Sequence, residues 1–128
     1  MSLRVELVVP DRELWSGEAS MVIAKTLEGD IGVLTGHSPV FGALAEGSIA
    51  EIVNDERRVR AAVSGGFLSV ADDRVSILAA QAELAGEVNV EQTRAELAAA
   101  LAEAAPGTED SPAVKYARAR LRAAGGQD

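Results

Sequence analysis

The sequence contains no cysteine and a single histidine, His37. Without cysteine there can be no disulfide, no thiol nucleophile and no thiolate ligand for zinc, and one histidine is too few for a histidine-rich metal site. A catalytic triad is also disfavoured, because no G-x-S-x-G motif is present and the adjacent Ser38 is expected to point away from His37. We therefore expect no metal site and no catalytic residues in this chain.

Aromatic residues are scarce, at 3% of the chain, and the formal net charge is −8. A nucleic-acid-binding protein needs cationic side chains for the phosphates and aromatic rings on which bases can stack. We therefore expect no nucleic-acid partner.

Long apolar runs are missing as well, although hydrophobic residues make up 48% of the sequence. No run approaches the ~20 residues that cross a bilayer, and the first residues lack the basic region and cleavage site of a signal peptide. Such a chain is expected to be soluble and to contact a membrane only through partners. Its 128 residues suffice for one folded core and a small appendage.

Short apolar segments separated by turn residues occupy the chain from residue 3 to residue 79. Between residues 3 and 7 every second side chain is apolar, as in a half-buried strand. The predicted strands are residues 3–7, 21–26, 31–34, 40–45, 48–53, 57–63, 67–70 and 74–79, and glycine, proline, asparagine and aspartate are frequent between them. This pattern predicts a β-sandwich or flattened barrel.

The periodicity becomes helical near Gly86. Asn89 is predicted to cap a first helix that ends before Pro106, and Ser111 before Pro112 predicts the start of a shorter second helix. Gly125-Gly126 is expected to end that helix. We thus predict an α+β chain, with a sandwich over residues 1–86 and a helical hairpin over residues 87–128. Because the hairpin is rich in alanine, it buries little apolar area and should open readily.

Four segments of the sequence are similar, in order and spacing, to the epsilon subunits of F-type ATP synthases. They read LRVELVVPDRELWSGEA (3–19), EGDIGVLTGHSPV (28–40), AVSGGFLSV (62–70) and RVSILAAQAEL (74–84). The resemblance implies two stacked sheets followed by two helices, in a non-catalytic subunit at the foot of the central stalk. Its implied partners are the gamma subunit, the c-subunit ring, and the alpha and beta subunits, on the cytoplasmic face of the membrane.

The same resemblance implies how such a subunit works. Its sandwich transmits rotation and so helps to couple proton flow to ATP synthesis, and its two helices can extend along gamma and restrain ATP hydrolysis. In this family a loop that corresponds to Glu28, Gly29, Asp30, Ile31 and Gly32 faces the c ring. We expect Glu28, Asp30 and His37 to be contact residues, whereas the local chemistry alone also fits a turn with two solvated acids.

The segment Gly65-Gly66-Phe67-Leu68 belongs to one of the matching runs. The glycine pair is predicted to let two backbones approach closely or to supply positive φ angles. Phe67 and Leu68 are expected to divide between the core and a partner surface.

The helices of some family members bind ATP when they are folded down, and their motif would fall on Val90-Glu91 and Arg94-Ala95 here. The match is incomplete, since Glu91 replaces an aspartate and Leu101 replaces the second arginine. Glu91 and Arg94 also fit an ordinary surface ion pair. We therefore expect no cofactor, and an ATP-sensing domain is the alternative function.

The end of the chain is basic, since four cations after residue 110 face one acid, Asp128. A helix that starts at Pro112 places Lys115, Arg118 and Arg122 in one stripe, beside an apolar stripe. The apolar stripe consists of Val114, Ala117 and Leu121. The basic stripe is predicted to meet either the acidic body of the chain or, as the family resemblance implies, an acidic segment of a catalytic beta subunit.

Overall fold

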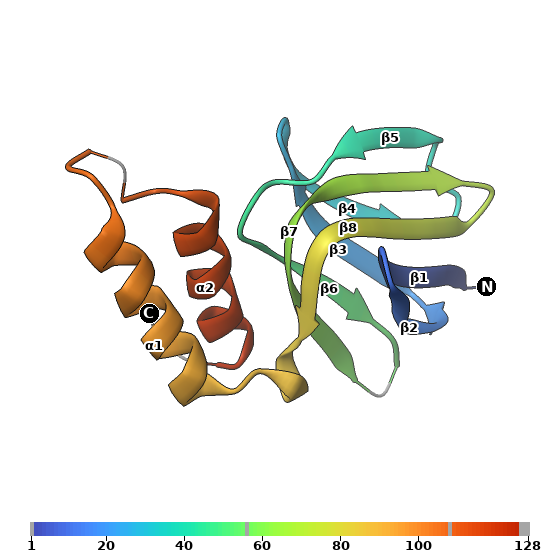
Figure 1. The fold of residues 1–128 in the computed structure, drawn as a ribbon. Coiled ribbons are helices and arrows are strands. Elements are labelled where there is room, and N and C mark those ends of the chain that lie inside the picture. Colours follow the sequence, from blue (N-terminus) through green and yellow to red (C-terminus); the bar gives the residue numbers. More distant parts are fainter. Residues whose placement is uncertain (1, 56, 108, 126–128) are drawn as a thin grey trace.

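The computed structural model describes residues 2–55, 57–107 and 109–125, which form a β-rich part followed by two helices (Figure 1). The described strands are β1 (Leu3–Val9), β2 (Arg12–Ala19), β3 (Met21–Thr26), β4 (Gly29–Leu34), β5 (Val40–Ala43), β6 (Ser48–Val53), β7 (Arg58–Ala71) and β8 (Arg74–Leu84). A 3-10 turn, η1 (Ala85–Glu87), leads to α1 (Val90–Glu103) and α2 (Pro112–Ala123). The predicted α+β architecture, a sandwich followed by a helical hairpin, is confirmed.

The strands are hydrogen-bonded in the order β2-β1-β8-β7-β6-β3-β4, with β5 added to β7. β7 links the two layers because its first half pairs with β6, its second half pairs with β5, and β8 follows it along both halves. Figure 1 shows both long strands turning through a bend between the layers. β1 pairs with β8 in parallel, so the first and last strands of the sandwich are neighbours.

The bend in β7 lies at Gly65 and Gly66, where the sequence predicted a break between two strands. Both residues have positive φ, at 71° and 99°, and a Cβ atom on Gly66 would lie 2.0 Å from the carbonyl oxygen of Leu78. The predicted close approach and positive φ are therefore both present. The strand is nevertheless continuous, because its pairing with β8 keeps one register on either side of the glycines.

Strand β2 was absent from the predicted strands. It pairs with β1 along its length, is charged at both ends and is interrupted by Gly17. The ring of Trp15 lies over this glycine, where a Cβ atom would come within 3.0 Å of it. A strand with few buried residues shows little alternation in the sequence, so periodicity alone did not reveal it.

The core between the layers follows the alternation that the sequence predicted. Leu3, Val5 and Leu7 of β1 are fully buried, and the same apolar cluster contains Ile77 of β8, which pairs with Leu7, and Ile52 of β6. The N-terminal half of β7 is covered on both faces, as its consecutive buried residues show. This second cover is provided by the hairpin.

Both helices begin where the sequence predicted. The side chain of Asn89 accepts a hydrogen bond from the amide of Gln92, and that of Ser111 accepts one from the amide of Val114. α2 ends at Ala123 and Gly125 has a φ of 89°, whereas Gly126 and Asp128 lie outside the described residues. No helix within the described ranges is both long and apolar enough to cross a bilayer.

Candidate functional site

The hairpin is docked on the outside of the sandwich, with α2 between α1 and the sheet (Figure 1). Ala119 and Ala123 of α2 pack on Ala62 of β7, and Ile49 and Tyr116 border this contact. Alanines on both sides allow the helix and the sheet to approach closely, but they bury little apolar area. Specific polar contacts therefore have a large share in holding the hairpin in place.

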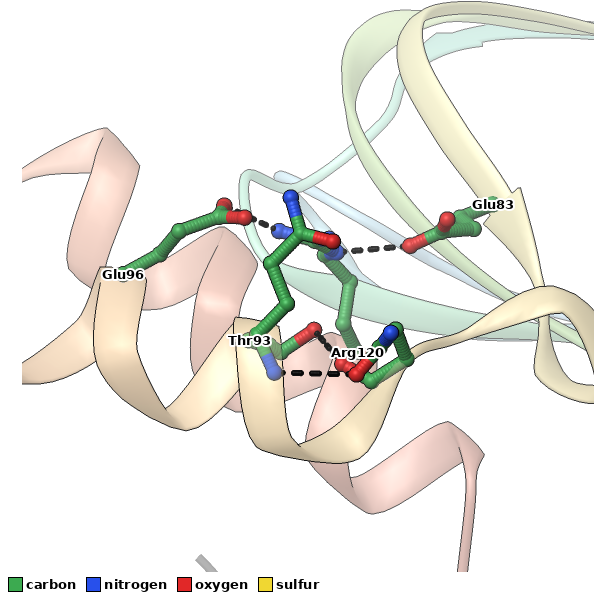
Figure 2. Close-up of polar contacts among 6 residues, drawn as sticks. Glu83, Thr93, Glu96 and Arg120 are labelled. Atoms are coloured by element: carbon green, nitrogen blue, oxygen red, sulfur yellow. Dashed lines mark hydrogen bonds and ion pairs between the residues drawn. The ribbon is translucent and has the colours of Figure 1, made fainter.

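Arg120 makes the central polar contact between the hairpin and the sandwich (Figure 2). Its Nε donates to Glu83 of β8 at 2.7 Å, and its Nη1 donates to Glu96 of α1 at 2.8 Å. The guanidinium also lies over the ring of Tyr116, 5.3 Å from its centroid. With 12% of its side chain exposed, Arg120 joins three elements in a largely desolvated position, where charge-assisted hydrogen bonds are strong.

Burial and charge shift two pKa values at this contact in the same direction. Burial opposes the charged form of Arg120, but hydrogen bonds with Glu96 and Glu83 outweigh it and raise the pKa of the guanidinium. Burial also raises the pKa of Tyr116, because it disfavours the phenolate, and the nearby Arg120 only partly offsets this. Both groups are therefore held in their protonated forms.

The predicted basic stripe lies on the side of α2 that borders the turn between β5 and β6. Lys115 and Arg122 are exposed and Arg118 is half-buried, while Val114, Ala117 and Leu121 are buried as the sequence predicted. Arg122 donates from Nη2 to the carbonyl oxygen of Gly47, in the turn between β5 and β6, at 3.1 Å. In this docked state the stripe meets the body of the chain through Arg122.

The acidic segment with Glu28 and Asp30 is the tip of the β3–β4 hairpin. Glu28 lies in the turn, and Asp30 pairs with Lys25 across the two strands. Glu28, Gly29, Asp30 and Gly32 are exposed, whereas Ile31 packs against the core. The exposed part of this segment is therefore a polar edge.

His37 is not part of that edge. It follows the far end of β4 and lies beside the turn between β7 and β8. The six residues of β4, at about 3.3 Å each, separate His37 from Glu28 by roughly 20 Å. The half-buried ring of His37 is within 2.7 Å of the carbonyl oxygen of Ser38 through Nδ1. The structure thus separates the predicted contact residues into two regions.

Asp30 and Arg122 line one pocket of about 370 Å³, although they are 92 positions apart in the sequence. The pocket also contains Gly47 and Glu46 from the β5–β6 turn, together with Lys25. The last turn of the docked helix therefore lies beside the polar edge. No pattern in the sequence predicts this proximity.

Glu91 and Arg94 are both exposed on α1. Another pocket, of about 430 Å³, lies between the hairpin and β8, and its lining includes Glu83, Tyr116 and Arg120 but neither Glu91 nor Arg94. The predicted nucleotide contacts of these two residues stay a prediction. In the described part of the chain, no three acidic or histidine side chains are grouped to hold a metal ion.

The outside of the β5–β7–β8 layer carries an apolar patch, formed by Phe41, Phe67 and Leu78. The rings of Phe41 and Phe67 stack with centroids 5.1 Å apart, and Leu78 is opposite Phe67 across the strands. These side chains are 67%, 47% and 44% exposed, respectively. Leu68 is fully buried, so Phe67 is the residue of the predicted pair that faces outward.

The comparisons with known proteins agree with this geometry. Residues 2–85 match the family model described as the ATP synthase delta/epsilon chain, beta-sandwich domain. An ATP synthase epsilon chain of Thermobifida fusca is 55% identical over 125 residues, which cover 95% of this chain and 91% of that protein. One of Streptomyces avermitilis is 47% identical over 121 residues and 94% of both chains. This chain belongs to the ATP synthase epsilon chain family.

Solved structures have the same fold at lower sequence identity. A chain of the Euglena gracilis mitochondrial ATP synthase, in an OSCP/F1/c-ring structure, has a TM-score of 0.73 at 22% identity and covers 97% of this chain and 79% of its own length. A chain of the Tetrahymena thermophila mitochondrial ATP synthase, in a central stalk/c-ring structure, has a TM-score of 0.58 at 18% identity. The match covers 97% of this chain and 91% of that chain. As a member of the epsilon chain family, the protein is a non-catalytic accessory subunit.

Sequence reasoning on this epsilon-family chain missed Arg120 as a site residue. It chose the three cations of the basic stripe, whereas Arg120 lies on the apolar face of α2, three positions from the buried residues Ala117 and Ala123. A cation inside the apolar arc of a helix requires acidic partners, and that signal could have identified it. Its partners Glu83 and Glu96 are 37 and 24 residues away in the sequence, so only the fold reveals them.

Proposed function

We propose that this chain is a rotor subunit at the foot of the central stalk, where it couples proton flow to ATP synthesis. The observation that carries this proposal is the exposed apolar patch of Phe41, Phe67 and Leu78. Exposed aromatic rings next to each other favour a protein interface, because they gain a large contact area for little loss of side-chain entropy. We assign the patch to the gamma subunit.

The polar edge with Glu28 and Asp30 fits a second contact, with the polar loops of the c ring. Exposed charges at a rim guide association and register more than they add affinity. His37, at the other end of β4, is assigned to a separate contact with the rotor. All these contacts keep the chain peripheral to the membrane, on its cytoplasmic face, and attached through the complex.

The hairpin is proposed to restrain ATP hydrolysis by leaving the sandwich and extending toward the alpha and beta subunits. Its small alanine contact with Ala62 supports this, since undocking exposes little apolar surface. The division of labour then falls near η1, with rotor binding in residues 1–86 and regulation in residues 87–128.

Two variants of the chain test this assignment in the assembled complex. A chain that ends after Gly86 should co-purify with gamma, and the complex should hydrolyse ATP faster than one with the full chain. Phe67→Asp should fold but fail to co-purify with gamma, while Leu34→Asp, at an exposed leucine outside the patch, should co-purify normally. Normal co-purification of Phe67→Asp would rule out the patch as the gamma interface.

An ATP-sensing role is the alternative, and it requires binding of MgATP to the isolated chain. Calorimetry with MgATP distinguishes the two functions. Saturable binding that Arg94→Ala abolishes would favour the sensor, whereas no binding at cellular concentrations would exclude the sensor and leave the rotor function as the remaining candidate.

A further inference from the structure

The docked helix rests directly on the turn between β5 and β6. A Cβ atom on Gly47 would lie 2.4 Å from both the carbonyl carbon and the carbonyl oxygen of Lys115, closer than nonbonded atoms approach. Gly47 also has a φ of 62°, and its carbonyl oxygen accepts the hydrogen bond from Arg122. The absence of a side chain at this position therefore lets the backbone of α2 reach the turn.

Arg120 lies elsewhere on the circumference of α2 and faces β8 and α1. Residues 115 and 120 are five positions apart, which places them about 140° apart around the helix at ~100° per residue. The two contacts thus hold α2 at different points of its circumference. The turn at Gly47 limits its approach to the sheet, and the Arg120–Glu83 pair ties it to the last strand of the sandwich.

Arg120 also controls the first helix, although α1 itself has little contact with the sandwich. Among the described elements, α1 packs mainly on α2, and its charged link to Arg120 runs through Glu96. Loss of Arg120 would leave two carboxylates, Glu83 and Glu96, on either side of the site without their shared cation. Like charges at short range repel, so the same substitution that removes the tie also pushes the hairpin away.

We propose that Gly47 and Arg120 form a latch that holds the hairpin in its docked, non-inhibitory position. This rests on the proposed function, in which the extended hairpin restrains ATP hydrolysis. Breaking the latch then strengthens the restraint, which is the opposite of what removing the hairpin or its outward-facing Arg118 does. Arg120 and Gly47 are positioning residues, since they act on hydrolysis only through the place of the hairpin.

The latch can be measured on the isolated full chain, because the absence of cysteine allows two spin labels to be placed without background. Ala71→Cys, at the end of β7, and Ala99→Cys, on α1, replace exposed alanines. Double electron–electron resonance then reports the distance between sandwich and hairpin. Gly47→Ala and Arg120→Met should each shift the distribution to longer distances, with the undocked-to-docked ratio rising about tenfold or more.

Matched controls separate the latch from general effects. Gly36 has a comparable φ of 83°, but a Cβ atom there meets nothing within 4 Å, so Gly36→Ala introduces similar backbone strain without a clash. Arg118→Met removes a cation from the same helix without touching Glu83 or Glu96. Both controls should keep the wild-type distance distribution.

The assembled complex provides the second measurement. Gly47→Ala and Arg120→Met should lower its rate of ATP hydrolysis several-fold, and truncation after Gly86 in the same chains should abolish the difference. Unchanged distances in both variants would overturn the latch, whatever the hydrolysis rates are. Longer distances with unchanged or faster hydrolysis would overturn the claim that undocking of the hairpin lowers hydrolysis. If truncation of the wild-type chain leaves hydrolysis unchanged, the proposed restraint itself is wrong, and the distances alone then show whether Gly47 and Arg120 hold the hairpin on the sandwich.

Discussion

The carboxylate of Asp73, in the turn between β7 and β8, accepts a hydrogen bond from the backbone amide of Gly36 at 2.7 Å. Asp73 has a φ of 60°, and its carbonyl oxygen accepts the amide of Arg4 at 2.8 Å. One residue in a left-handed conformation therefore connects the segment before His37 to the first strand.

Asp73→Gly should loosen the segment before His37 without unfolding the sandwich. The lost hydrogen bond to a charged acceptor is worth ~1.5–3 kcal/mol, and relief of the positive φ offsets about 1 kcal/mol of this. Exchange of the Gly36 amide, followed by NMR, should become about tenfold faster. Asp73→Asn should stay near the wild-type rate, since asparagine tolerates this φ and can accept the same bond.

The neighbouring Asp72, with a φ of 51°, supplies the control for Asp73→Gly. Asp72→Gly relieves similar strain and leaves the Asp73 carboxylate in place, so the Gly36 amide should exchange as in the wild type. Unchanged exchange in Asp73→Gly would show that the carboxylate does not restrain this segment.

Neutralising the polar edge should reduce coupling and leave the fold intact. We expect Glu28→Gln with Asp30→Asn to lower proton pumping per ATP hydrolysed in reconstituted membranes, because both charges lie in the proposed contact with the c ring. The domain should stay folded, because exposed charges contribute little to stability. Neutral amides are preferable to lysines, since a lysine at position 30 would face Lys25 directly across the strands.

Two exposed acids at the connection between β1 and β2 provide the control for this experiment. Asp11→Asn with Glu13→Gln removes the same charge elsewhere on the sandwich and should leave the pumping ratio unchanged. An unchanged ratio in the Glu28 and Asp30 variant as well would exclude the polar edge from the rotor interface.

Tyr116 should make hairpin docking sensitive to alkaline pH. Its folded pKa is raised above the ordinary value of 10.0, so its stabilising contribution is complete below pH 10 and is lost as the pH rises through the folded pKa. Each unit of such a shift corresponds to about 1.4 kcal/mol. The free energies of unfolding of the wild type and Tyr116→Phe, measured with denaturant, should therefore differ by a constant amount below pH 9. Above pH 10 the wild type should lose stability relative to Tyr116→Phe.

As Tyr116 is the single tyrosine, the absorbance of its phenolate provides a direct check on the same sample. The titration midpoint should lie above 10 in the full chain. A midpoint at 10, or parallel stability curves up to pH 11, would contradict the buried environment of this ring.

Arg118→Ala should raise ATP hydrolysis by the assembled complex. Arg122 bonds to Gly47 in the docked state, so a change at Arg118 alone tests the proposed contact with an acidic partner without disturbing docking. Salt screens such a contact over ~8 Å, and added salt should narrow the gap between variant and wild type. Arg57→Ala, at an exposed arginine of the sandwich, is the control, and equal rates for wild type and Arg118→Ala at low salt would exclude a role for Arg118.

Local patterns in the sequence predicted most of the fold. The alternation in residues 3–7 identified β1, and the residues Asn89 and Ser111 identified the helix starts, because strand burial and helix capping depend on neighbours a few positions apart. β2 was not predicted, because an edge strand with few buried side chains shows no alternation of apolar and polar residues. The bend of β7 was misread as a break, since glycines can either end a strand or turn it.

The site was less predictable because it depends on contacts between distant residues. The family resemblance identified Glu28, Asp30 and His37 as candidates. It did not predict that His37 lies at the opposite end of β4 from the two acids. Arg120 meets Glu83 and Glu96, and Gly47 meets Lys115, only after the hairpin has docked. Such pairs have no fixed spacing along the chain, so no local pattern identifies them.

The parallel pairing of β1 with β8 has a consequence for synthesis on the ribosome. Arg4 pairs with Arg74, so the strand that is translated first acquires this neighbour only when the last strand has emerged. Long-range parallel pairing of this kind is slow, and until it occurs β1 can rely on its local hairpin with β2. The helices are translated later still, so a nascent chain can present its proposed gamma-binding face before the helical hairpin exists to dock on the sandwich.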